Sequence, residues 1–448
     1  MMGLPQPVLL WSDALLFMLI AAVVALAWWA RQQEPLRAAW AEVGRSPVAM
    51  ASATILAVFL LIGLLDSLHY RARLADSPAT SAAPQYSVEV SSALDALLTK
   101  LRTRSEKTYS APLATHLYAK ETAENSPQRD FPRLKYGGAH LGEQLARQDA
   151  DIAVRTLRGV AAGVLCWLLL HGLMRLIGRP TPAMSLTLLL IAMLGGIAVS
   201  LSAGYHVFGT DKVGQDVLYL SLKSVRTALL IGTLTTLVML PVAVLLGILA
   251  GYAGGWIDDA IQYIYTTLNS IPGVLLIAAA VLMMQVVIDT HPDWFATAAE
   301  RADARLLALC LILGMTSWTG VARLLRGETL KLRELEFVQA ARAFGVSDWA
   351  IMRRHILPNL MHIVLIALVM DFSGLVLAEA VLSYVGVGVD PSTTSFGTMI
   401  NAARMELARE PMVWWSLVAA FGFMFVLVLA ANLFADAVRD AFDPRSSG

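Results

Sequence analysis

The sequence predicts an all-α integral membrane protein with about nine transmembrane helices and one long polar insertion. Of its 448 residues, 57% are hydrophobic and only 15% are charged, whereas soluble proteins of this size carry about 25% charged residues. The mean hydropathy is +0.62. Apolar runs of nearly 20 residues, the length needed to cross a bilayer, recur along the chain.

Nine apolar runs are candidate membrane spans. Backbone polar groups in lipid have to be satisfied within the segment, so each run is predicted to be a helix. The runs cover residues 10–30, 48–65, 157–176, 185–203, 227–251, 261–285, 306–325, 363–385 and 413–434.

The first run does not have the features of a signal peptide. Residues 1–10 contain no Lys or Arg, so the basic region that precedes a signal sequence is missing. We therefore expect this run to be retained as a span, with the N-terminus outside.

Residues 66–156 differ in composition from the rest of the chain. They are polar and charged, and they include several prolines and tyrosines and a stretch of helical character at 90–102. We expect a folded or partly folded soluble insertion. A disordered tether is the alternative, because the apolar content is modest.

The distribution of basic residues predicts the orientation. The densest basic cluster among the shorter loops lies between the seventh and eighth spans, and the positive-inside rule places it in the cytoplasm. The C-terminus is then cytoplasmic as well, whereas the N-terminus and the insertion 66–156 are outside. The cluster comprises Arg326, Lys331, Arg333, Arg342, Arg353 and Arg354.

The same loop contains an amphipathic segment at 334–359. Phe337, Ala340, Ala341 and Phe344 recur at helical spacing, and Gly345 is suited to the left-handed residue that follows a helix. Ser347 and Asp348 can begin a second helix, which Pro358 would limit. The pattern predicts helix, sharp turn, helix. Its residues alone fit a docking device and an interfacial hairpin on the lipid headgroups equally well.

This segment closely resembles the EAA loop of bacterial ABC importer permeases of the oligopeptide/dipeptide/nickel branch. The resemblance implies a coupling helix that seats in a groove of an ATPase subunit. Gln339 stands where the family usually has Glu, and Glu336 supplies a neighbouring carboxylate. The positions that the resemblance assigns to coupling are Glu336, Gln339, Ala340, Ala341, Phe344, Gly345, Leu357 and Pro358.

The resemblance extends over about residues 205–445. A segment after the fourth span is similar to the family's periplasmic FGTDxxGRDV motif, with Gln215 in place of its usual Arg. Further similar stretches are residues 247–258, 270–276, 377–389 and 440–445. The motif positions are Gly209, Thr210, Asp211, Gly214 and Asp216.

The resemblance divides the chain into four parts. Residues 185–448 correspond to a six-span permease core, and the three earlier spans and the insertion have no place in the common pattern. The predicted parts are 1–65 (two extra helices), 66–156 (insertion), 157–184 (an extra helix and a cytoplasmic turn) and 185–448 (core).

Polar residues within the spans are candidates for the translocation path. Asp371 and Glu379 lie eight residues apart on one span, and intramembrane carboxylates usually face a polar interior. An internal hydrogen bond that fixes helix packing explains them equally well. Asn269 and Pro272 predict a kink that lines the path or the permease–permease interface, or that merely bends the helix. Gly247, Gly251 and Gly255 follow one another at intervals of four residues, and this small-residue spacing predicts tight helix packing.

The sequence contains no catalytic or metal-ligand pattern and no phosphate-binding P-loop, so we expect a permease that is not an enzyme and holds no cofactor. The net charge is zero, so the chain has no overall positive field that would attract nucleic acid, and we expect no nucleic acid partner. The resemblance implies ATP and Mg in two cytoplasmic ATP-binding subunits, a second homologous permease and an extracytoplasmic substrate-binding protein. It also implies the cell inner membrane and peptide import, although nickel and other small solutes are carried by close relatives. An ion-driven secondary transporter and a non-transport membrane scaffold are the alternatives.

Overall fold

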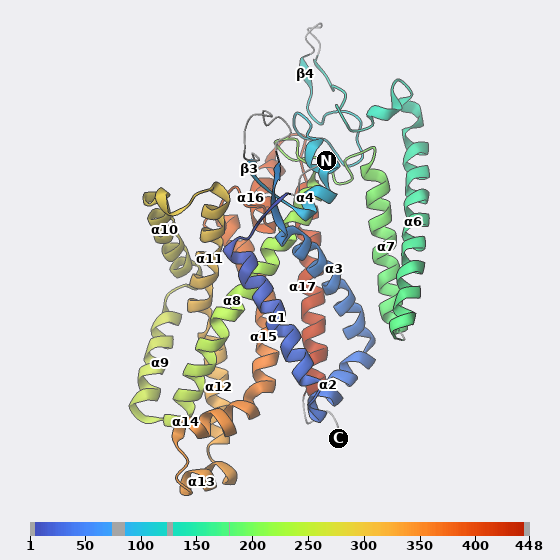
Figure 1. Cartoon of the computed structure of the whole chain (residues 1–448). Helices are drawn as coiled ribbons and strands as arrows, with labels where there is room; N and C mark the ends of the chain where they lie inside the picture. The colour runs from blue at the N-terminus through green and yellow to red at the C-terminus, as the bar shows by residue number, and fades with distance from the viewer. Residues whose placement is uncertain (1–4, 74–85, 123–128, 179, 443–448) are drawn as a thin grey trace, which may run out of the picture. The chain divides into compact units, whose positions relative to one another are not determined.

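The computed structural model describes residues 5–73, 86–122, 129–178 and 180–442 (Figure 1). The parts of the insertion at 74–85 and 123–128, and the family-like ending at 443–445, lie outside the described residues. The chain divides into two compact units. Unit one comprises Met1–Asp13, Ala41–Ala228 and Pro391–Phe434, and unit two comprises Ala14–Trp40, Leu229–Asp390 and Ala435–Gly448.

Helices dominate the described residues. They are α1 (Trp11–Ala30), α2 (Glu34–Arg45), α3 (Pro47–Ser67), α4 (Ala93–Leu97), α5 (Thr99–Thr103), α6 (Gln148–Ile177), α7 (Pro182–Ser202), α8 (Val217–Ala253), α9 (Gly255–Ser270), α10 (Gly273–Thr290), α11 (Ala298–Ser317), α12 (Thr319–Leu332), α13 (Glu336–Ala343), α14 (Asp348–Ile351), α15 (Leu357–Val385), α16 (Phe396–Arg404) and α17 (Trp415–Phe442). The strands are β1 (Gln6–Val8), β2 (His69–Arg73), β3 (Tyr86–Ser92), β4 (Glu121–Thr122) and β5 (Arg129–Asp130).

Eight helical stretches among the described residues are long and apolar enough to cross a membrane, and α1 contributes a shorter apolar stretch, Trp11–Ala25. The chain is thus an all-α membrane protein, as predicted. The eight stretches are Pro47–Ser67, Leu145–Leu176, Pro182–Ser202, Val217–Ala253, Gly273–Thr290, Ala298–Leu332, Asp348–Val385 and Trp415–Phe442.

The sixth predicted span, 261–285, is not one helix. The chain breaks into α9 and α10 between Ser270 and Gly273, at the site where Asn269 and Pro272 predicted a kink. Ile271 and Pro272 have extended backbone, with ψ of 132° and 117°. Pro272 has no N–H to continue the helical ladder, and its ring disfavours helical geometry in the residue before it.

In unit one, α6 and α7 form a closely packed hairpin (Figure 1). Gly159 permits this approach, because a Cβ at this position would lie 2.6 Å from the Cα of Ile197. Gly163 and Gly196 face backbone of the opposite helix in the same way. Such close packing of small residues is the usual means of association between helices in lipid.

Parts of the described insertion form regular structure within unit one, and the segments between them are turns and irregular backbone. Strands β1, β2 and β3 form an antiparallel sheet, and β4 pairs with β5 in a short hairpin. Ser92 ends the sheet and begins α4, where its side chain and that of Asp95 form a reciprocal capping box.

In unit two, two of the three glycines with predicted small-residue spacing hold α8 against α12. A Cβ at Gly247 would lie 2.7 Å from the carbonyl oxygen of Ala322, and one at Gly251 would lie 2.6 Å from the Cβ of Thr329. The prediction is wrong for Gly255. It lies beyond the end of α8, has a φ of +56° and has no atom within 4 Å of its Cβ position.

Candidate coupling segment and substrate path

The segment 334–359 in unit two forms a helix, a tight turn and a second helix. Gly345 follows α13 with a φ of +76°, the left-handed conformation that its residue type predicted. The N–H of Gly345 donates to the carbonyl of Arg342, and that of Val346 donates to the carbonyl of Ala341. These two bonds make a Schellman motif, which ends α13 abruptly and satisfies its last carbonyls.

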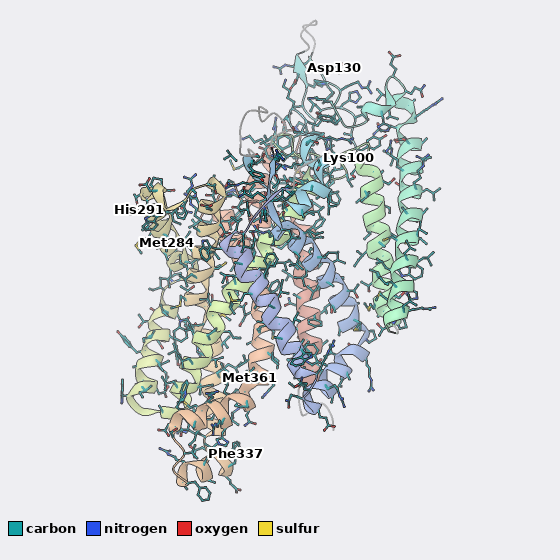
Figure 2. All side chains as sticks on the ribbon, in the orientation of Figure 1. Lys100, Asp130, Met284, His291, Phe337 and Met361 are labelled. Atoms are coloured by element: carbon teal, nitrogen blue, oxygen red, sulfur yellow. The ribbon has the colours of Figure 1, made fainter. Side chains whose placement is uncertain are left out.

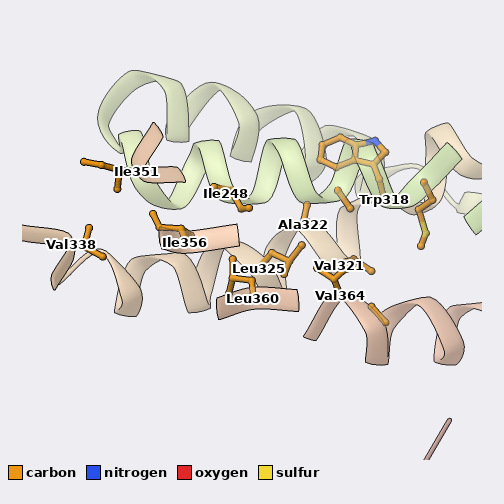
Figure 3. Close-up of a cluster of buried hydrophobic side chains, with 13 residues drawn as sticks. Ile248, Trp318, Val321, Ala322, Leu325, Val338, Ile351, Ile356, Leu360 and Val364 are labelled. Carbon is orange, nitrogen blue, oxygen red and sulfur yellow. The ribbon is translucent and has the colours of Figure 1, made fainter. Parts of the chain in front are cut away.

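One face of this segment is buried in the hydrophobic core of unit two (Figure 3). Val338 of α13, at 2% exposure, and Ile351 of α14 join a cluster with residues of α8, α12 and α15. The Tyr252 hydroxyl of α8 also donates to Asp348 at 2.7 Å. The segment therefore packs against α8, α12 and α15 in one continuous core. The cluster comprises Met239, Ala243, Ile248, Trp318, Val321, Ala322, Leu325, Val338, Ile351, Ile356, Leu360, Val364 and Ala367.

Another side of the segment exposes two aromatic rings. Phe344, the residue that caps α13, is 88% exposed, and Phe337 is 43% exposed. They are seven residues apart, about two helical turns, so both lie on one side of the segment. Phe337 and His291 lie at opposite ends of unit two (Figure 2). Aromatic residues exposed at the tip of a projecting segment are typical of an interaction surface.

The eight predicted coupling residues all lie in or beside this segment, but they differ in exposure. Ala341 and Leu357 are half-buried, and the others are exposed: Glu336, Gln339, Ala340, Phe344, Gly345 and Pro358. The Gln339 amide donates to the carbonyl of Glu334 at 3.1 Å, a contact within its own chain.

The prediction that Pro358 limits the second helix is wrong. The helical stretch runs without a break from Asp348 to Val385. A π-helical turn at Met352–Ile356 precedes Pro358, which sits in the first turn of α15. The wider turn accommodates a residue that lacks a donor N–H and whose ring would crowd the carbonyl four residues earlier.

The predicted path residues lie in different surroundings. Asn269 lines a hollow of about 450 Å³ with Tyr265, Thr266, Ser270 and Arg323, and its Oδ1 accepts from the Thr319 hydroxyl at 3.2 Å. Neither Asp371 nor Glu379 is among the described residues that line this hollow.

The two carboxylates of α15 differ from each other. Glu379 is 1% exposed and accepts a hydrogen bond from Ser383, one turn along the same helix, at 2.6 Å. This contact favours the packing role. The Oδ2 atom of Asp371 is buried and has no hydrogen-bond partner in the part of the chain that the structure describes.

The family-like motif in unit one forms a turn that caps α8. Gly209 and Gly214 have φ values of +70° and +80°. Asp211 Oδ1 accepts from the N–H groups of Val213 and Gln215 at 2.9 and 2.8 Å. Asp216 precedes α8, and its Oδ1 accepts from the Leu218 N–H at 2.9 Å. The motif residues thus shape the turn and satisfy the helix start.

Two residues that the sequence did not single out, Glu106 and His206, bind the insertion to this turn. His206 Nδ1 lies 2.7 Å from Asp216 Oδ2, and its Nε2 lies 3.3 Å from Glu106 Oε1. Three consecutive backbone N–H groups, from Lys135 to Gly137, donate to Glu106 at 2.8–3.0 Å. His206 and Asp216 are only ten residues apart, on the two sides of the turn, and this is the one sequence signal that could have indicated their contact.

These contacts control ionisation in the cluster. Burial opposes a charge on His206, but its bonds to Asp216 and Glu106 outweigh burial and raise its pKa to about 9. Burial would raise the pKa of Glu106, but His206 and the three N–H donors lower it to about 2. At neutral pH the imidazole is therefore charged and donates from both nitrogens.

The membrane helices and the projecting helix–turn–helix define a multi-pass membrane protein with an exposed helical segment. The chain belongs to the family of binding-protein-dependent transport system inner membrane components, whose pattern its residues 243–448 match. Membership of this family favours the ATP-driven class over an ion-driven transporter and over a scaffold.

Three relatives are similar to the chain over 54% of its length. The oligopeptide transport system permease protein of Mycobacterium tuberculosis (strain ATCC 25618 / H37Rv) is 31% identical, with 76% of its length covered. The glutathione transport system permease protein of Pectobacterium atrosepticum is 33% identical, with 73% covered. The dipeptide transport system permease protein of Lactococcus lactis subsp. cremoris is 31% identical, and the chain spans only 64% of that relative's length.

Proposed function

We propose that the chain is the permease subunit of an ATP-driven, binding-protein-dependent importer of peptides. Its partners are two cytoplasmic ATP-binding subunits, which bind ATP and Mg, a second homologous permease and an extracytoplasmic substrate-binding protein. Peptide cargo is supported by the names of the relatives, which are oligopeptide, dipeptide and glutathione permeases.

The observation that carries this proposal is the two-faced α13. Its exposed side presents Phe337 and Phe344, and its buried side places Val338 in the same core as α8, α12 and α15. Closure of the ATP-binding subunits would push on the exposed face and turn the three long helices together. Substrate release then follows from a change in the relative stability of outward-open and inward-open states.

The orientation that fits this mechanism has the coupling segment and the C-terminus in the cytoplasm. The basic residues around the segment, including Arg342, Arg353 and Arg354, support it through the positive-inside rule. The N-terminus and the insertion 66–156 are then extracytoplasmic, in a protein of the inner membrane.

Purification of the tagged chain in mild detergent, followed by mass spectrometry, tests the composition of the complex. We expect ATP-binding subunits, a second permease and a binding protein to co-purify. Reconstitution of that complex should give uptake of peptides that stops without ATP. A chain that purifies alone while other membrane complexes survive, or uptake that follows an ion gradient without ATP, would overturn the proposal.

A further inference from the structure

The hollow of about 450 Å³ in unit two is open and polar. It is lined by Tyr265, Thr266, Asn269 and Ser270 of α9 and by Arg323 of α12. All of these residues except the half-buried Tyr265 are exposed. The hollow is therefore accessible from the surroundings of the protein and is not enclosed by its helices.

Arg323 is the first charged residue after an apolar span. Residues 306–322 carry no charged side chain and separate it from Arg305 within the helical stretch Ala298–Leu332. The two arginines are 18 residues apart, which corresponds to roughly 27 Å along the helix axis. The hydrocarbon core of a bilayer is about 30 Å thick, so Arg305 and Arg323 lie near its two borders.

The neighbouring span α10 indicates the same level for the hollow. One end of α10 is joined to α11 by an ion pair between Asp289 and Arg305. Just before the other end, Asn269 accepts a hydrogen bond from the Thr319 hydroxyl at 3.2 Å. The 18 residues of α10, Gly273–Thr290, are themselves long and apolar enough to cross a membrane. The hollow that Asn269 lines thus lies at the level of the lipid headgroups.

The guanidinium of Arg323 is oriented by an aromatic ring and forms no ion pair within the described ranges of the chain. Its central carbon lies 5.0 Å from the centre of the Tyr265 ring, a cation–π contact. Asp258 of α9 is occupied by Arg326, which donates to it twice at 2.6 Å. Among the described residues that line the hollow, none is acidic. The charge of Arg323 is therefore available to an anion.

The other side chains of the hollow add donors to this charge. The Oδ1 atom of Asn269 is occupied by its hydrogen bond, which leaves the amide NH₂ as a donor. The Thr266 hydroxyl also lines the hollow. The Tyr265 hydroxyl donates to Gln262 at 3.2 Å, so this residue contributes its ring. A planar guanidinium beside amide and hydroxyl donors matches the oxygens of a phosphate.

We propose that Arg323, Asn269 and Thr266 bind the phosphate of an anionic membrane phospholipid. The headgroup level of the hollow, its open side and its uncompensated charge all favour this ligand. Lys331 and Arg333 lie farther along the same basic end of the helix and add to the positive potential that attracts anionic lipid. The inference depends on the geometry of the spans and goes beyond the transport function.

The test uses the purified, delipidated full chain with its co-purifying subunits and measures bound lipid by native mass spectrometry. Phosphatidylglycerol is titrated, and a diacylglycerol with the same acyl chains is the control lipid that lacks a phosphate. The unaltered chain should bind phosphatidylglycerol at a saturable site and should not bind the diacylglycerol there. Arg323→Gln should weaken the binding of phosphatidylglycerol about tenfold. Arg323→Lys retains the charge but loses the planar fork, so its affinity should be intermediate.

Three further variants separate the contributions to binding. Asn269→Asp keeps the acceptor for Thr319 but places a carboxylate beside the site, so it should weaken binding at least tenfold. Tyr265→Phe keeps the ring and should bind like the unaltered chain. Arg439→Gln is the matched control, because it removes an exposed arginine of α17 that pairs with Asp436 at 3.1 Å. It should leave the affinity unchanged, and thermal melting confirms that each variant is folded.

Several outcomes would overturn the inference. An unchanged affinity in Arg323→Gln means that the arginine does not bind the headgroup. An equal loss in Arg439→Gln means that the general surface charge attracts the lipid. If inorganic phosphate alone raises the melting temperature of the unaltered chain as much as phosphatidylglycerol does, the ligand is a soluble anion. If Arg323→Gln loses a partner subunit on purification, the arginine pairs with an acid of that subunit.

Discussion

At the scale of single residues, the strongest electrostatic feature outside the membrane spans is the buried cluster of Glu106, His206 and Asp216. Its side chains are almost fully enclosed, with exposures of 2%, 4% and 0%. A buried imidazolium between two carboxylates is stable only while all three groups keep their charges. The cluster therefore makes the stability of unit one depend on pH in a defined direction.

The contribution of His206 to stability should disappear at alkaline pH. Its folded pKa of about 9 lies above the ordinary value of 6.5, so its contribution is complete below about pH 6.5 and is lost as the pH rises to 9. The Glu106 contribution is present above pH 4.5 and is lost toward pH 2. The melting temperature of the purified chain should fall by several degrees between pH 6.5 and 9.

The variant His206→Gln isolates this effect. It should melt lower than the unaltered chain at pH 6.5, and the difference should shrink by pH 9. The control, His291→Gln, changes an exposed histidine of unit two and should follow the unaltered chain. A constant difference between His206→Gln and the unaltered chain across this range would show that the imidazole is not charged in the folded protein.

At the scale of elements, the proposed docking residues of α13 and its C-terminal cap are exposed, whereas its packing residue Val338 is buried. Phe344→Ser removes an 88% exposed ring and should leave the melting temperature unchanged, while retention of the ATP-binding subunits falls tenfold or more. Val338→Ala removes a 2% exposed side chain and should cost about 1–3 kcal/mol of stability. Co-purification and thermal melting measure both effects. Full retention of the subunits in Phe344→Ser would mean that this face does not dock.

The α6–α7 hairpin offers a matched pair of adjacent glycines. A Cβ at Gly196 would lie 3.0 Å from the Gly163 nitrogen and closer still to the Gly159 carbonyl, whereas Gly195 has open space. Gly196→Ala should destabilise the hairpin by about 1–3 kcal/mol, because backbone atoms cannot yield cheaply. Gly195→Ala should be neutral or slightly stabilising, since Ala favours helix over Gly. Equal melting temperatures of the two variants would contradict the close packing.

Element types and their ends were predictable to different degrees. Long apolar runs indicated the spans, and Gly345 indicated the turn after α13, because both signals are local. The pairing of Gly159 with Ile197 was not predictable, since it depends on which helices meet. Pro272 and Pro358 show the limit clearly. Both lack a donor N–H, yet one separates two helices and the other follows a π-helical turn within a continuous helix.

At the scale of the whole chain, the insertion is bound to the rest of unit one by charges distant in sequence. Lys223 of α8 donates to two residues of the insertion, Asp66 at 2.6 Å and Asp95 at 3.3 Å. Arg226 of α8 binds the first turn of α1 in the same way, by donating to Asp13 at 2.6 Å. Partners separated by 128 to 213 residues leave no periodic signal, so the sequence could not predict them. They indicate that the insertion and the first turns of α8 fold as one structure.

Two hypotheses for the insertion follow from the extracytoplasmic position that we propose for it: it contacts the binding protein or substrate, or it stabilises the complex. Its contacts favour stabilisation. Deletion of residues 77–148 removes Asp95 and Glu106 and leaves Lys223 and His206 with fewer partners. Lys223 keeps Asp66 and His206 keeps Asp216, but each loses one ion pair, so the deleted chain should melt lower. If the insertion stabilises the complex, the deleted chain should also lose its partner subunits together with transport.

A surface variant of the insertion distinguishes the two hypotheses, because it leaves these charges in place. Val88 and Leu97 are 84% and 68% exposed, so their replacement by Ser does not alter packing within the chain. If the insertion stabilises, Val88→Ser with Leu97→Ser should retain normal uptake, assembly and melting temperature. If the insertion instead receives the binding protein on this surface, uptake should fall while the complex stays intact. If the chain that lacks residues 77–148 keeps its melting temperature and its partner subunits but loses transport, the insertion contacts the binding protein or substrate, and the stabilising role is contradicted.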